Sequence, residues 1–370
     1  MGTPIDKLTI EGFKSIRKLE NFELRGLNVL IGANGAGKSN FVDFFRFLQE
    51  LIDRNLQLTT AKRGGAHRIL FLGPKVTQRI AANIVFENMG ESGLQRRVSH
   101  EFVLEPTIDN RLIFATEMMS CSDFNSDWGD QLGAGHQESN LAMGLSARKL
   151  HIPRWRVYHF HDTSGTAPMK LPCTVRDYEY LRPDAANLAP FLLRIQQENA
   201  ATYGFIRDTV RLTAPFFNDF ILRPRKSGPD VDVLMEWSQV GGVDYPFHPS
   251  QLSDGTLRFI CLATALLQPN PPSTVIIDEP ELGLHPHALS ILTSLIKQAT
   301  AKGTQVIVST QSTALVDDFE PEDIVVVDRD TGQSRFRRLT AGELSAWVEI
   351  DYSLGELWQK NVLGGGPVHE

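Results

Sequence analysis

The sequence predicts an α/β fold with a mainly parallel sheet, into which a lobe of mixed helices and strands is inserted. The first observation is a short apolar run, residues 27–31, which leads through a glycine-rich loop into a helical apolar pattern over residues 40–56. The second is the regular alternation of helices and β-rich apolar runs after residue 245. Because the pattern between residues 80 and 245 differs from both, we expect this segment to split the α/β core.

Each part of the chain contributes its own elements. Strands are expected at residues 5–10 and 19–31. In the insert we expect strands at 80–88, 98–116 and 220–237, a polar mobile loop at 120–146 and helices over 186–213. Beyond it we expect helices at 256–267 and 286–301 and strands at 274–278, 305–310 and 323–328. The expected domains are 1–80, 81–245, 246–340 and a tail at 341–370, with no heptad pattern that would predict a long coiled coil.

The composition excludes several classes of protein. With 370 residues and 42% hydrophobic residues, the chain can bury a large core, and its net charge of −7 gives no overall basic field. Basic clusters at 148–156, 223–226 and 335–338 are most simply a solvated rim. The three cysteines have no metal spacing, and the longest apolar run, 259–267, is too short to span a bilayer. We therefore expect a cytoplasmic protein that does not enter the membrane.

A phosphate-binding loop is predicted at residues 32–39, where the sequence reads Gly-Ala-Asn-Gly-Ala-Gly-Lys-Ser. Glycines in such a loop let backbone N–H groups point at phosphate oxygens, at the positive end of the following helix. Lys38 would reach the β- and γ-phosphates, and the Ser39 hydroxyl would bind Mg²⁺. The expected nucleotide-binding residues are Gly32, Asn34, Gly35, Ala36, Gly37, Lys38, Ser39 and Asn40. A chance glycine turn is disfavoured by the strand before it and the helix after it.

The acidic partner of this loop is predicted at the end of the strand at 274–278. Open α/β sheets place ligands at the carboxyl ends of their strands, so Asp278 is expected to hold Mg²⁺. Glu279, one residue further on, is expected to polarise the attacking water. An ordinary strand cap is the alternative, which the phosphate loop makes less attractive.

A third motif, Leu-Ser-Asp-Gly-Thr, occupies residues 252–256 and opens a helix. Ser253 is suited to cap that helix, and its N-terminus can bind an anion. The simpler alternative is a well-capped helix with no ligand. The position of the motif, directly before the strand that ends in Asp278, favours the anion site.

In this order, the three motifs resemble the ABC-type ATPase heads of the RecF, SMC and OLD families. Residues 252–256 stand where those heads carry a Leu-Ser-Gly-Gly-Gln signature, with Asp254 and Thr256 as departures. The segment Gly-Phe-Lys-Ser-Ile at 12–16 is similar to their first hairpin, and residues 352–358 resemble the tail of a bacterial family of stand-alone predicted ATPases.

This resemblance implies a homodimer with two ATP and Mg²⁺ sites, each shared between two chains. Ser253 and Gly255 of one chain would complete the nucleotide site of the other. Residues 281–285 would cross the dimer interface, and Gln311 would stand at the switch position, where many relatives have histidine. Gln78 is a candidate for the family's metal-sensing glutamine, although an ordinary surface residue is the favoured interpretation.

The sequence leaves the biological role open. The resemblance and the basic clusters favour an ATPase that acts on DNA or in genome defence; the alternative is a nucleotide-gated scaffold that regulates a separately encoded nuclease or toxin. An ATPase subunit of a transporter is disfavoured by the large insert. Asp328 and Asp330 are interpreted as part of a hairpin turn, and the histidine pairs 159/161 and 285/287 lack a third ligand for zinc.

Overall fold

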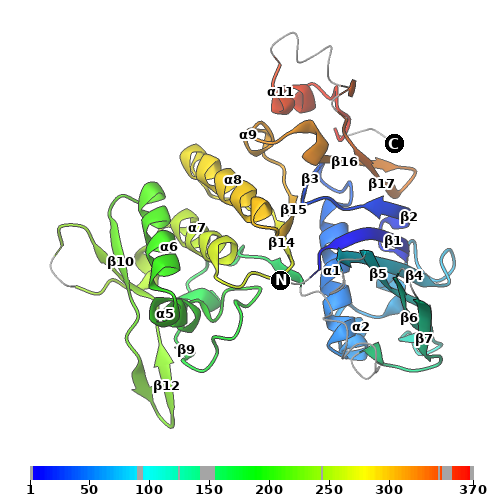
Figure 1. The fold of residues 1–370 in the computed structure, drawn as a ribbon, viewed down its shortest axis with the longest axis horizontal. Coiled ribbons are helices and arrows are strands. Elements are labelled where there is room, and N and C mark those ends of the chain that lie inside the picture. The colour runs from blue at the N-terminus through cyan, green and yellow to red at the C-terminus, as the bar shows by residue number, and fades with distance from the viewer. Residues whose placement is uncertain are drawn as a thin grey trace.

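A computed structural model describes residues 3–89, 95–123, 126–141, 155–242, 245–340, 342–343 and 352–366. Its centre is a six-stranded sheet in the order β17-β16-β3-β15-β14-β8, in which only β17 runs antiparallel to its neighbour (Figure 1). These strands are β3 (Leu27–Ile31), β8 (Trp155–Tyr158), β14 (Thr274–Asp278), β15 (Gln305–Ser309), β16 (Ile324–Asp330) and β17 (Gln333–Arg338). The predicted mainly parallel sheet is confirmed, as is the turn between β16 and β17.

A second sheet is antiparallel, in the order β2-β1-β4-β5-β6-β7. Its strands are β1 (Ile5–Phe13), β2 (Ile16–Glu23), β4 (Ile80–Met89), β5 (Gln95–Pro106), β6 (Leu112–Asp123) and β7 (Ser126–Gly133). Helix α1 (Lys38–Ile52) lies between the two sheets and shares one hydrophobic core with both. Because it is covered on both sides, α1 buries side chains such as Phe41, Phe44 and Phe47.

Strand pairing divides the predicted insert of residues 81–245 among three places. β4 to β7 extend the sheet of β1 and β2, and β8 forms the edge of the parallel sheet beside β14. The prediction of a mobile loop at 120–146 is wrong for β7 and for the end of β6, since these residues pair as antiparallel strands. An edge strand needs backbone hydrogen bonds on one side only, so a polar sequence can form it. Residues 142–146 lie outside the described part of the chain.

The remaining part of the insert forms an arm, residues 159–247, on the side of the parallel sheet away from the antiparallel one (Figure 1). Its elements are β9 (Cys173–Thr174), α5 (Leu188–Glu198), α6 (Ala200–Thr213), β10 (Phe217–Ile221), β11 (Arg225–Ser227), β12 (Asp230–Val233) and β13 (Glu236–Gln239). The helices expected over 186–213 are confirmed as α5 and α6, which Asn199 separates; its side chain caps α6 by accepting from the Thr202 amide.

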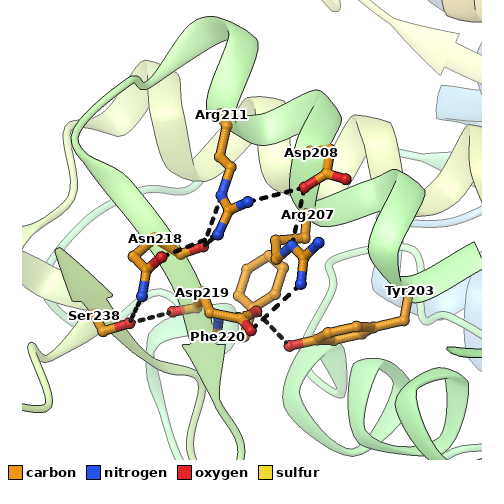
Figure 2. A network of polar contacts seen from close by, with 8 residues as sticks. All are labelled: Tyr203, Arg207, Asp208, Arg211, Asn218, Asp219, Phe220 and Ser238. Atoms are coloured by element: carbon orange, nitrogen blue, oxygen red, sulfur yellow. Dashed lines mark hydrogen bonds and ion pairs between the residues drawn. The ribbon is translucent and has the colours of Figure 1, made fainter. Parts of the chain in front are cut away.

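A polar network joins α6 to the strands of the arm (Figure 2). Arg211 donates to the backbone carbonyl of Asn218 at 2.8 Å, and the Tyr203 hydroxyl donates to Asp219 at 2.8 Å. The Asn218 amide continues the network to Ser238 on β13 at 3.2 Å. Helix α6 also packs in one hydrophobic core with α7 (Asp254–Leu267), so apolar contacts join the arm to that helix.

Further helices follow α1, lie beside the strands of the parallel sheet or come near the C-terminus. They are α2 (Leu56–Lys62), α3 (Ala66–Ile69), α8 (Pro286–Ala301), α9 (Thr313–Val316) and α11 (Leu354–Gln359). Gly355 lets α11 approach α9 closely, because a Cβ there would lie 2.7 Å from the Thr313 carbonyl oxygen. None of the helices among the described residues has the length and apolar character needed to cross a membrane.

Candidate functional site

The predicted phosphate loop connects β3 to α1, as the sequence indicates. Lys38 begins α1, and Gly37 before it has a φ of 117°, a left-handed conformation that favours glycine. A Cβ on Gly32 would lie 2.2 Å from the Val327 carbonyl oxygen on β16, so this end of the loop also requires glycine. Asn34 and Gly35 are exposed, whereas Ala36 is buried.

The loop is held by elements that are distant in sequence. Ser334 on β17 donates to the Ala36 carbonyl at 2.6 Å and lies 2.7 Å from the Ser15 hydroxyl. The side chain of Asn40, predicted to bind nucleotide, donates to Ser15 at 2.7 Å. Arg329 donates to the Gly35 carbonyl at 3.0 Å. Asn40 therefore fixes the loop, together with residues that sequence reasoning did not identify.

Lys38 is buried, and its ammonium group donates to the backbone carbonyls of Gly32 and Ala33. Burial lowers the pKa of Lys38, while the carboxylates of Glu279, Glu281 and Asp278 act in the opposite direction. The loop and the acidic strand end are thus within electrostatic range. An ammonium group held by neutral carbonyls in a desolvated site is well suited to a phosphate.

Asp278 ends β14, and its carboxylate is buried. Asp278 Oδ1 accepts a hydrogen bond from the Ser309 hydroxyl. Its Oδ2 faces two cationic or polar groups, Arg46 at 3.7 Å and His159 at 4.0 Å. Ser309 on the neighbouring strand therefore anchors one oxygen of the Asp278 carboxylate, and the other oxygen faces Arg46 and His159.

Glu279 adopts a left-handed backbone conformation with a φ of 46°, which is uncommon outside glycine and concentrates at functional sites. Its amide donates to the Ser309 carbonyl at 2.8 Å. The Gln311 side chain donates to Glu279 Oε1, so the two predicted catalytic side chains are in contact. Sequence reasoning gave no chemical role to Glu281, which accepts from the Gln311 amide at 2.7 Å and whose pKa is raised by burial.

This donor set fits a nucleotide with a divalent ion. Glycine-rich backbone, a buried lysine and the exposed Ser39 lie at the start of α1, and the buried carboxylate of Asp278 ends β14. Hard divalent cations prefer such oxygen ligands, so Ser39 and Asp278 are the residues that would hold Mg²⁺.

The signature residues lie at the start of α7 (Asp254–Leu267). Ser253 caps the helix by accepting from the Thr256 amide at 3.1 Å. A Cβ on Gly255 would lie 2.2 Å from the Gly283 carbonyl oxygen, so glycine permits close contact with the segment after Glu281. In the part of the chain that the structure describes, the hydrogen bonds and ion pairs of residues 253–258 do not reach residues 32–40.

Two side chains, Lys170 and Arg258, hold the signature in place, and the sequence alone did not connect either of them with it. Asp254 would place a carboxylate beside an anion site, and Lys170, itself buried, lies 3.7 Å from it. Arg258 is buried and donates to the carbonyls of Phe160 and Leu282, which ties α7 to the loop after β8 and to the segment after β14.

A pair of histidines follows β8 at the same edge of the sheet. His161 Nε2 donates to the Asp278 backbone carbonyl at 2.9 Å, and the rings of His159 and His161 are 3.8 Å apart. Burial, followed by the positive field of His161 and Arg46, lowers the pKa of His159 to about 4. Gln78, by contrast, is an exposed residue before β4. The sequence analysis considered the pair His159 and His161 only as zinc ligands and set it aside for lack of a third ligand.

Two protein-family models match the chain. One is described as "AAA domain, putative AbiEii toxin, Type IV TA system" and matches residues 145–317. The other is described as "AAA domain" and matches residues 7–112. Together they include the phosphate loop, the signature, the acidic strand end and the switch residue Gln311.

The fold is that of SMC heads. An SmcHead bound to the C-winged helix domain of ScpA aligns with a TM-score of 0.61 and 17% identity, over 93% of this chain and 99% of that one. An Smc head domain with an extended coiled coil, bound to the C-terminal domain of ScpA derived from Pyrococcus furiosus, gives 0.58 and 16%, over 94% and 99%. A curated protein, Urease accessory protein 2 of Cryptococcus neoformans var. grubii, is 37% identical over 109 residues. That match covers 28% of this chain but only 8% of the fungal protein.

Replacing Lys38 by methionine tests the stability of the fold and the binding of ATP in one experiment. Because burial of the ammonium group costs more than the attraction of the nearby carboxylates returns, as the lowered pKa of Lys38 shows, we expect Lys38→Met to leave the free energy of unfolding unchanged or to raise it by about 1 kcal/mol. The stabilisation by saturating ATP, about 2.7 kcal/mol at a hundredfold excess over Kd, should disappear. Denaturant unfolding with and without ATP measures both effects. The exposed Lys62→Met variant is the control, and a Lys38→Met chain that ATP still stabilises would contradict the site.

Proposed function

We propose that this chain, an SMC/RecF-like ABC-type ATPase, hydrolyses ATP with Mg²⁺ and closes as a head-to-head homodimer around two nucleotides. The observation that carries the proposal is the division of the ligand groups. Lys38, Asp278 and Glu279 lie within electrostatic range of one another, whereas Ser253 caps a helix whose polar contacts do not reach the phosphate loop in the described part of the chain. A second chain can supply the missing Ser253 and Gly255.

The chemistry follows from the contacts at the carboxyl edge of the sheet. Lys38 neutralises charge on the β- and γ-phosphates. Bound Mg²⁺, held by Ser39 and Asp278, would withdraw electron density from the γ-phosphate. Glu279 accepts a proton from the water that attacks phosphorus, and the bond between the γ-phosphorus and the bridging oxygen breaks to release ADP. Gln311 holds the Glu279 carboxylate in place through its amide N–H.

ATP keeps the dimer closed in this scheme, because the γ-phosphate contacts both chains. Hydrolysis removes these contacts, and the chains separate. The switch therefore depends on the difference between the contacts made to ATP and those made to ADP. A γ-phosphate that contacted only its own chain would produce no such difference in association.

Glu279→Gln is expected to bind ATP, hydrolyse it at least about a hundredfold more slowly and accumulate as a closed dimer, because the general base is lost while the binding groups remain. Mass measurement in solution with and without Mg-ATP checks this. Lys38→Ala, which should bind no ATP, is the matched control and should stay monomeric. A Glu279→Gln chain that remains monomeric at saturating Mg-ATP would refute the shared site.

Lys170→Met is expected to weaken ATP-driven dimerisation about tenfold, since it leaves Asp254 unpaired at a site that must accept a γ-phosphate. The second change Asp254→Gly should restore dimerisation, because it removes the carboxylate that Lys170 offsets. Dimer dissociation constants in the Glu279→Gln background measure both effects. If the double variant is as weak as Lys170→Met alone, the pair has no such role.

We further propose that the switch serves DNA maintenance or genome defence in the cytoplasm. The resemblance to RecF and SMC heads supports DNA, and the words "putative AbiEii toxin" in one matching family description support defence. Two residues of the basic clusters already have partners within the chain. Arg156 is half-buried and lies over the Tyr180 ring at 4.3 Å, and Arg225 pairs with Glu236 at 2.7 Å. Most of the 148–156 cluster lies outside the described residues.

A nucleotide-gated scaffold for a separate effector protein is the second candidate. Large apolar side chains are exposed on the arm and could contact a protein: Phe205, Leu212, Phe216, Val240 and Tyr245. Phe216 and Val240 are neighbours, joined by a backbone hydrogen bond of 2.9 Å. The SmcHead to which this chain is similar was solved with a protein partner, the C-winged helix domain of ScpA.

Binding to short duplex DNA decides between the two candidates. If DNA is the partner, ATP-bound Glu279→Gln should bind it more tightly than the nucleotide-free chain. With three phosphate contacts, affinity should fall roughly 40-fold between 50 and 200 mM salt. Fluorescence anisotropy across salt concentrations measures this. Absence of binding at low salt would reject DNA in favour of the protein partner.

A further inference from the structure

A second cluster of titratable side chains faces Asp278 from outside the motifs discussed above. His159 and His161 follow β8, which pairs in parallel with β14, and Arg46 lies on α1. His159 Nδ1 is 4.0 Å from Asp278 Oδ2, and His161 donates to the Asp278 backbone carbonyl. The mechanism proposed above gives none of these three side chains a role.

The position of the Arg46 guanidinium group shows where this cluster attracts a positive charge. Its Nη2 lies 3.2 Å from His159 Nδ1 and 3.7 Å from Asp278 Oδ2. Because a guanidinium group can only donate, His159 Nδ1 is the acceptor, and the imidazole presents a lone pair at this point. A nitrogen donor and a carboxylate oxygen therefore already share one positive charge, and a lone pair of this kind is what a metal ion requires.

The surroundings allow a metal ion to replace the guanidinium group. Arg46 and His159 line an open cavity of about 670 Å³ together with Gln49 and Tyr180, so Arg46 has room to turn away. Two donors that each bind an octahedral ion at about 2.1 Å lie about 3.0 Å apart as adjacent ligands and about 4.2 Å apart as opposite ones. The separation of 4.0 Å between His159 Nδ1 and Asp278 Oδ2 lies between these values, so a small rotation of the His159 side chain would bring the pair to a ligand separation.

We propose that His159 is a nitrogen ligand of the divalent ion bound with ATP, and that it makes the site select Mn²⁺ over Mg²⁺. The inference rests on the proposed function, because Asp278, Ser39 and the nucleotide supply the other ligands. Mg²⁺ prefers oxygen ligands, whereas imidazole nitrogen favours first-row transition metals. A glutamine, as expected in the family's metal-sensing loop, would offer an oxygen and no such selectivity.

The direct test is pulsed electron paramagnetic resonance of Mn²⁺ bound to the full-length chain. Glu279→Gln is used so that ATP stays intact. We expect ³¹P couplings from the nucleotide and a ¹⁴N modulation from a directly bound imidazole. His159→Gln should keep the ³¹P couplings, lose the ¹⁴N modulation and weaken Mn²⁺ binding about tenfold or more, with a smaller effect on Mg²⁺.

His161→Gln is the matched control, since its ring lies beside that of His159 but its Nε2 is bound to a backbone carbonyl. It should retain the ¹⁴N modulation. Persistence of the modulation in His159→Gln, or its loss only in His161→Gln, would overturn the assignment. A chain with ³¹P couplings but no ¹⁴N modulation would overturn the inference and leave ATP binding intact. Absence of both signals would contradict the proposed function, and this inference with it.

Discussion

The site depends on the parallel pairing of β3, β15, β14 and β8. In the register of these strands, Asp278 pairs with Ser309 and Ser309 pairs with Leu30. The phosphate loop begins at Gly32, two residues after Leu30, and therefore at the same edge of the sheet as Asp278. All four strands point their carboxyl ends at the same edge of the sheet, where ligands bind in open α/β folds. Lys38 and Asp278 are buried at that edge, where the low dielectric strengthens the attraction of each charge for a ligand of opposite sign. A phosphate and a divalent ion would satisfy both.

Contacts from distant parts of the chain hold this edge in shape. Ser15 and Ser334 fix the phosphate loop, and the tail reaches the same place, since a Cβ on Gly365 would lie 3.2 Å from the Gly32 Cα. On the other side, Arg258 ties the signature helix to the segments after β8 and β14. Helix α6 packs with the signature helix α7 in one hydrophobic core, and the polar network joins α6 to the strands of the arm (Figure 2). If the γ-phosphate contacts the signature as proposed, a change there would be passed to the arm through these packed helices.

The sequence predicted the motif-bearing elements well because their signals are local. β14 and α8 have the predicted bounds, and α1 and α7 begin within two residues of the predicted starts, because apolar spacing and capping residues determine them. The edge strand β7 was predicted as a mobile loop because its sequence is polar and contains glycine, which hides its pairing with β6. The division of the insert among two sheets and an arm depends on strand order, which one sequence does not reveal. Lys170 and Arg46 were not singled out, and His159 was set aside for lack of a third ligand, because their contacts with Asp254 and Asp278 come from other elements.

The central claim is that each nucleotide site is built from two chains. It is tested most directly by mixing two defective chains, one with Lys38→Met in its phosphate loop and one with Ser253→Arg in its signature. Each variant alone should be inactive in ATP hydrolysis. In a mixed dimer, the intact loop of one chain meets the intact signature of the other, so the mixture should recover up to about a quarter of the activity of the unmodified chain, given one of two sites in half of the dimers. A mixture as inactive as its components, or a Ser253→Arg chain that hydrolyses ATP alone, would contradict the account.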